Sequence, residues 1–97
     1  MCLMGAAQAQ ERLYWVSGKE LQQTCETDAQ VCIGFITGVS DALEALAWPR
    51  PRTCRPDAVT RDEVLRVAQG ALMAAPSRAA GPAFDILADA FVAEWPC

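Results

Sequence analysis

The sequence contains no histidine, so the side chain that most often transfers protons at neutral pH is missing. Catalytic sites of the Ser-His-Asp and Cys-His types are therefore excluded. The cysteines include no C-x-x-C pair, which is typical of structural zinc sites, and no Gly-rich phosphate loop follows a strand. We expect no metal, no cofactor and no enzymatic activity.

Carboxylates are the remaining candidates for chemistry, and two pairs share a helical face: Asp85 with Asp89, and Asp41 with Glu44. No neighbouring sequence feature would desolvate one member of either pair and turn it into an acid catalyst. We interpret both pairs as solvated helix faces.

The chain also lacks a basic tract and an uninterrupted apolar stretch of the roughly 18 residues that a membrane span needs. Eight basic and twelve acidic residues give a net charge of -4, which argues against a nucleic-acid partner. Hydrophobic residues make up 53% of the 97 residues, enough for one domain with a core. A domain of this size buries only about 60 to 65% of its unfolded surface, so a covalent staple is expected.

The first nine residues carry no charge and end in Ala7-Gln8-Ala9, an A-x-A cleavage pattern. We interpret residues 1–9 as the remaining part of a secretory signal peptide that lacks its basic N-terminal region. Residues 10–97 then form a single domain. The alternative is a frayed apolar N-terminus. Export would place the domain outside the cytoplasm.

Removal of residues 1–9 removes Cys2 and leaves four cysteines, which in a small exported chain predict two disulfides. We favour Cys32–Cys54 with Cys25–Cys97, because Cys25 and Cys32 would lie too far apart if both were helical. The set Cys25–Cys32 with Cys54–Cys97 stays open if the proline-rich loop does not return along the second helix.

Helix boundaries are marked by capping residues. Ser17 and Glu20 form a capping box before a first helix that ends near Cys25, and Asp28 can cap a second helix over 29–47. Apolar residues recur along this second helix at helical spacing, which predicts that it is the centre of the core.

Two further helices follow. Thr60 and Glu63 form a second capping box before a helix that must stop before Pro76, residues 77–81 form a turn, and Pro82 suits the first position of a fourth helix. The predicted fold is all-α, a small disulfide-stapled bundle of about four helices.

Gly34, Gly38 and Ala42 stand four residues apart on the second helix. Each mid-helix glycine costs about 1 kcal/mol relative to alanine. We predict that another helix packs closely on this column, from the same chain or a second copy. A functional backbone contact is the alternative.

The proline-rich segment from Trp48 to Asp57 predicts a stiff loop that is suited to binding another protein, because Trp and Arg are enriched at interface hot spots. The alternative is that Trp48 packs on the helix end while the arginines only solubilise the chain. The candidate partner-binding residues are Trp48, Arg50, Arg52, Arg55 and, in the later turn, Arg78.

Several of these residues together resemble the Rap1a/Tai immunity family. The resemblance covers nearly all of residues 10–97, and its most specific parts are the run Cys32-Ile33-Gly34-Phe35-Ile36-Thr37-Gly38-Val39-Ser40-Asp41-Ala42 and the terminal Trp95-Pro96-Cys97. Its other parts are Ser17-Gly18, Leu21, Cys25, Cys54-Arg55-Pro56, Val59-Thr60 and Pro76. The resemblance implies a helical, often dimeric periplasmic protein that binds and sterically inhibits a peptidoglycan amidase effector of a type VI secretion system.

Two positions depart from the family pattern. Arg55 stands where an apolar residue is usual, and the cluster after Pro76 is thinned to Arg78. These departures imply a different effector or another role. The alternative function is a periplasmic chaperone similar to the small helical acid-stress proteins, whose many carboxylates would titrate together and expose apolar surface at low pH.

Overall fold

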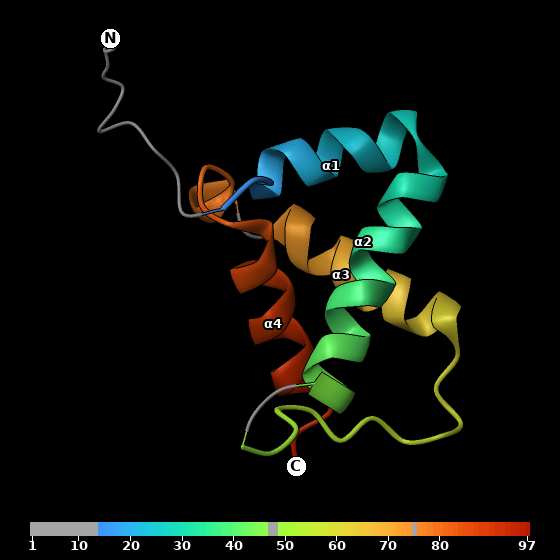
Figure 1. The fold of residues 1–97 in the computed structure, drawn as a ribbon. Coiled ribbons are helices and arrows are strands. Elements are labelled where there is room, and N and C mark those ends of the chain that lie inside the picture. Colours follow the sequence, from blue (N-terminus) through green and yellow to red (C-terminus); the bar gives the residue numbers. More distant parts are fainter. Residues whose placement is uncertain (1–13, 47–48, 75) are drawn as a thin grey trace, which may run out of the picture.

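A computed structural model describes residues 14–46, 49–74 and 76–97 (Figure 1). The helix α1 crosses the top of the view, α2 descends from its end, and α3 and α4 pack beside α2 (Figure 1). Among the described residues there is no strand, apart from an isolated bridge between Ser17 and Pro82. The predicted all-α bundle is confirmed.

The elements of the bundle are α1 (Gly18–Thr27), α2 (Ala29–Asp41), the π-helical turn η2 (Ala42–Leu46), α3 (Arg61–Ala74), the 3-10 turn η3 (Pro76–Arg78) and α4 (Ala83–Glu94).

Both predicted capping boxes are present. The Glu20 amide donates to the Ser17 hydroxyl at 3.1 Å, and the Ser17 amide donates to the Glu20 carboxylate at 2.8 Å. At the start of α3, the Glu63 amide donates to the Thr60 hydroxyl at 3.2 Å and the Thr60 amide donates to the Glu63 carboxylate at 2.9 Å. The Thr60 amide, and then its hydroxyl, lower the pKa of Glu63 by stabilising the carboxylate.

Three helix boundaries differ from the sequence-based prediction. The helix α1 continues to Thr27, beyond the predicted end near Cys25. Asp28 separates the two helices and caps α2, its side chain accepting from the Val31 amide at 3.3 Å. The predicted helix over 29–47 changes to π-helical geometry at Ala42, and its last residue lies outside the described residues. Pro82 is the N-cap of α4 rather than its first helical residue.

The helix α4 contributes more buried residues to the core than α2, which was predicted to be its centre and which also contacts all the other helices. Phe91 and Leu87 of α4 are fully buried, and Trp95 stacks on Phe91 with ring centroids 5.7 Å apart. The helix α4 has apolar side chains around most of its circumference and contacts α1, α2 and α3. The buried hydrophobic residues are Leu21, Cys32, Ile36, Val39, Leu43, Val64, Ala68, Leu72, Ala83, Ile86, Leu87, Ala88, Phe91 and Trp95.

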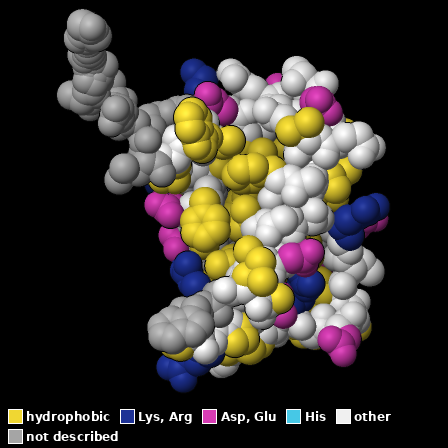
Figure 2. Space-filling view, viewed as in Figure 1, with side chains coloured by type: hydrophobic (Ala, Val, Ile, Leu, Met, Phe, Trp, Pro, Cys, Tyr) yellow, Lys and Arg dark blue, Asp and Glu magenta, His cyan; other side chains and the backbone are white. Residues whose placement is uncertain are grey.

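Much of α2 faces outward instead. By length and composition alone, Ala29–Leu46 could cross a membrane, since its 18 residues have a mean hydropathy of 1.3, but core helices pass the same test. Only 28% of the segment is buried. Hydrophobic side chains also reach the surface over α4 and beside α1 (Figure 2). Large exposed hydrophobic residues are Trp15, Val31, Leu46, Met73 and Phe84.

The disulfides join Cys25 to Cys32 and Cys54 to Cys97, with a Cα–Cα distance of 4.8 Å in each. The favoured pairing of Cys32 with Cys54 and of Cys25 with Cys97 was therefore wrong, and the alternative set is correct. The chain leaves helical geometry at Asp28 (φ -147°, ψ 87°), so the last turn of α1 folds back onto the first turn of α2. The proline-rich loop does not return along α2 but crosses its C-terminal end beside the chain terminus (Figure 1).

The glycine column on α2 does not contact another helix of the chain. A Cβ atom added to Gly34 or Gly38 would meet nothing within 4 Å. The predicted close packing within the chain is thus wrong, because α1, α3 and α4 lie on the other side of α2. The close approach occurs at Gly18, where an added Cβ would lie 2.6 Å from Cδ1 of Ile86 on α4. The intramolecular fold gives Gly34 and Gly38 no packing role.

Replacing Cys54 and Cys97 by alanine should lower the free energy of unfolding by about 4 kcal/mol, because the bond closes a loop with a sequence separation of 43. Removing the Cys25–Cys32 bond, with a separation of only 7, should cost about 2.5 kcal/mol through loop closure. Urea unfolding without reductant measures both values. A loss below about 1 kcal/mol for the Cys54/Cys97 variant would contradict the staple role.

Candidate protein-binding site

The candidate site is the proline-rich loop between η2 and α3, of which residues 49–60 are described. Its tip, Pro49–Arg52, is exposed along its whole length, with the side chains of Arg50 and Arg52 in solvent. Trp48, the predicted aromatic anchor, lies outside the described residues. Within the described part of the chain, neither Arg50 nor Arg52 forms an ion pair. The two guanidinium groups are therefore available to acidic groups of a partner.

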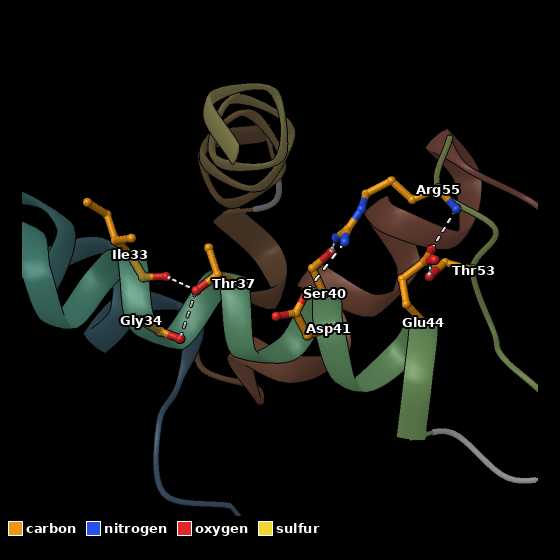
Figure 3. A network of polar contacts seen from close by, with 8 residues as sticks. All are labelled: Ile33, Gly34, Thr37, Ser40, Asp41, Glu44, Thr53 and Arg55. Atoms are coloured by element: carbon orange, nitrogen blue, oxygen red, sulfur yellow. Dashed lines mark hydrogen bonds and ion pairs between the residues drawn. The ribbon is translucent and has the colours of Figure 1, made fainter. Parts of the chain in front are cut away.

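One carboxylate on η2 fixes the path of this loop (Figure 3). Oε2 of Glu44 accepts from the Thr53 hydroxyl at 2.7 Å and from the Arg55 amide at 2.6 Å. Thr53 is buried, with 2% of its surface exposed, so its hydroxyl depends on this acceptor. The pair Asp41 and Glu44 was interpreted as a solvated face, and for Glu44 that interpretation was wrong. Its side chain reaches the loop because η2 lies directly beside it.

Arg55 turns back toward α2 rather than outward (Figure 3). Its Nη1 donates to the Ser40 hydroxyl, and its Nη2 lies 3.4 Å from Oδ1 of Asp41. Ser40 is almost fully buried, whereas Asp41 is 72% exposed. Arg55 was predicted to bind a partner, but its guanidinium contacts its own chain. We therefore describe Arg55 as a residue that positions the loop.

The other side of the loop is held by the C-terminus. The Cys54 amide donates to the Trp95 carbonyl at 2.9 Å, next to the Cys54–Cys97 bond. The Arg52 amide donates to the Leu43 carbonyl at 2.9 Å, which ties the tip to η2. Attachment on both sides, together with the fixed φ angles of three prolines, leaves the tip few conformations to lose on binding.

Arg78 does not join this site. It lies in η3, before the start of α4, whereas the loop meets the end of α4 (Figure 1). Its Nη2 is 2.9 Å from Oδ2 of Asp89 in an exposed ion pair. The structure thus brings Arg50, Arg52 and Arg55 into one loop and places Arg78 at the opposite end of α4.

A cleft of about 200 Å³ lies between α2, the loop and the start of α3. Arg61 and Asp41 give it charges of both signs, and Val59 and Val64 line its apolar part. Sequence reasoning did not identify Arg61 or this cleft, because its walls come from three separate segments. The remaining lining residues are Thr37, Arg55 and Thr60.

Replacing Glu44 by alanine should lower the free energy of unfolding by about 2 kcal/mol, because the buried Thr53 hydroxyl and the Arg55 amide both lose their acceptor. The Glu44→Gln variant keeps a carbonyl acceptor and should lose less. Urea unfolding measures the loss, and hydrogen exchange at the Arg55 amide should accelerate in Glu44→Ala. The matched control is Glu26→Ala on the exposed side of α1, and equal losses in both alanine variants would disprove the anchoring role.

Comparison with known proteins assigns residues 17–97 to a protein family. No curated protein and no solved structure matched the chain. A family model described as Rap1a immunity proteins matches residues 17–97. The match begins at Ser17, the N-cap of α1, and ends at Cys97, so it includes both disulfides and the candidate loop. The chain belongs to the Rap1a immunity protein family.

Proposed function

We propose that this protein is a periplasmic immunity protein that binds and sterically inhibits a peptidoglycan amidase effector of a type VI secretion system. Membership of the Rap1a family supports immunity against a secreted effector. The rigid cationic loop tip is the observation that carries the rest of the proposal. It is held by Glu44 on one side and by Cys97 on the other.

Steric inhibition suits this geometry. An inhibitor has to fill or cover the substrate cleft of its target, and a preorganised protrusion loses little conformational entropy when it does so. Arg50 and Arg52 supply charge-assisted hydrogen bonds to carboxylates, and their charge speeds the encounter with an acidic surface. Such a role requires no catalytic group in the immunity protein. The family likewise points to a non-enzymatic inhibitor.

The disulfides support action outside the cytoplasm. Both pairs, Cys25–Cys32 and Cys54–Cys97, are formed, and such bonds persist in oxidising compartments such as the periplasm. We propose that residues 1–9 are the end of an export signal that is removed. We also propose that the mature chain pairs with a second copy.

Arg52→Glu and Arg50→Glu should each weaken binding to the cognate amidase by at least about tenfold, since each reverses one charge at the tip. Lys19→Glu is the matched control. It makes the same charge change on the exposed first turn of α1, where a carboxylate is compatible with the helix dipole. Calorimetry with purified type VI amidases, beginning with any encoded in a neighbouring gene, measures the affinities.

Two outcomes would count against this proposal. If Lys19→Glu weakens binding as much as the loop variants, the loop tip is not the contact surface. If no amidase binds and the wild-type chain leaves cells sensitive to every type VI amidase expressed in their periplasm, the target class is wrong.

The exported chain should begin at Gln10 and contain two disulfides. Cleavage after Ala9 follows from the A-x-A pattern, and oxidation of four thiols removes four hydrogens from the mass. Intact-mass spectrometry of the chain purified from whole cells that express it, before and after reduction, tests both statements. An uncleaved N-terminus or four free thiols would argue against a periplasmic site of action.

A further inference from the structure

We infer that the cleft between α2, the loop and the start of α3 binds one acidic side chain of the effector, with Arg61 as the residue that pairs with its carboxylate. This inference rests on the proposed function, because the effector is the partner that supplies the side chain. It concerns a surface apart from the loop tip, so it does not depend on Arg50 and Arg52.

The volume of the cleft sets the size of its occupant. The cleft holds about 200 Å³, whereas pockets for drug-sized ligands and cofactors usually hold about 300 to 1,000 Å³. Its walls come from α2, from the loop and from the first turn of α3, so three segments of the fold define its shape. A space of this size accepts a single protruding side chain rather than a cofactor or a helix.

The charged residues of the cleft favour an anion with a single charge. Two arginines, Arg55 and Arg61, line it together with one carboxylate, that of Asp41, so the lining carries one net positive charge. Asp41 lies 3.4 Å from Nη2 of Arg55 and offsets the charge of that arginine. A dianion such as phosphate would meet repulsion from Asp41, whereas one carboxylate matches the charge that remains.

Arg61 is the cation of the cleft that is left without a partner. Within the described residues, its guanidinium forms no hydrogen bond and no ion pair. The pKa of Glu63, two residues along α3, is lowered by hydrogen bonds from Thr60 and then by the charge of Arg66, not by that of Arg61. The exposed Arg61 guanidinium is therefore available for a two-point contact with an incoming carboxylate.

The apolar part of the cleft favours an acidic side chain over a free inorganic anion. Val64 is buried, with 3% of its surface exposed, and Val59 is half-buried. Both line the cleft together with Arg61. The methylene groups of an aspartate or glutamate side chain can pack against the two valines while the carboxylate reaches the guanidinium.

Continuity with the loop identifies the effector as the source of this side chain. Arg55 belongs to both the loop and the cleft, and its guanidinium lies over Ser40 and Asp41 of α2 (Figure 3). Arg52, at the tip, precedes Arg55 by three residues, so their Cα atoms are no more than about 11 Å apart. An interface of ordinary size, about 800 Å² on each partner, covers both the tip and the cleft.

Titration of the isotope-labelled, oxidised chain with N-acetylglutamic acid α-amide, followed by NMR at neutral pH, tests the site without an effector. The only charge of this probe is its side-chain carboxylate. It should shift the backbone amide signals of Val59 and Arg61 until they saturate, with a dissociation constant on the order of 10 mM, because one charge-assisted contact is formed. The neutral analogue, N-acetylglutamine amide, should cause no such shift.

Arg61→Gln should abolish the response to the probe. The matched control is Arg66→Gln, which removes the same charge from an exposed position of the same helix outside the cleft and should keep the response. Urea unfolding should give the same midpoint for both variants as for the wild-type chain, since neither side chain is buried.

Calorimetry with a cognate amidase tests the source of the carboxylate. Arg61→Gln should weaken binding by about tenfold, because it removes one charge-assisted contact from the interface. Arg66→Gln should weaken binding by less than about twofold.

Three results would overturn the inference. One is a wild-type chain that shows no saturable shift, or an Arg61→Gln variant that keeps it. Another is equal amidase affinity in Arg61→Gln and Arg66→Gln. The third is tighter binding of N-acetylvaline, whose carboxylate represents a chain terminus, than of the glutamate probe. If no amidase binds while the response at Arg61 persists, the proposed function fails and the carboxylate site stands.

Discussion

The Cys54–Cys97 bond is the constraint on which the rest of this structure depends, because it closes the chain at the end where the core helix finishes. The most buried element, α4, ends in Trp95, and the loop from η2 passes directly beside that residue. A chain of this size has a small hydrophobic core, which by itself stabilises the position of a proline-rich loop only weakly. The covalent link supplies the additional stabilisation. Together with the hydrogen bonds to Leu43 and Glu44, the bond joins the loop, the C-terminus and η2.

The charged residues in and around the loop are of two kinds. Glu44 accepts hydrogen bonds from the buried part of the loop, and Arg55 turns back to Ser40 and Asp41. These contacts direct both side chains toward their own chain rather than toward a partner. The tip, Pro49–Arg52, presents the cations that remain in solvent. In the proposed inhibitory role, this division keeps the support fixed and leaves the tip accessible to a partner.

The helix α2 has two different faces. One contributes Cys32, Ile36 and Val39 to the core, and the other presents Val31, Gly34 and Gly38 to solvent. Such a helix has a high mean hydropathy although little of it is buried. Membership of the Rap1a immunity protein family implies binding to an effector partner, and exposed apolar area of this kind is typical of surfaces that bind other proteins.

The sequence by itself determined the helices, because their signals are local. Ser17 with Glu20, and Thr60 with Glu63, lie three residues apart, and such neighbours cap a helix whatever surrounds them. The sequence also indicated the stiff loop and the family. Only the tertiary structure decided the disulfide pairing, the inward turn of Arg55 and the open space at Gly34 and Gly38. These features depend on the sharp turn at Asp28 and on the path of the loop, which bring together or separate residues that local spacing does not relate.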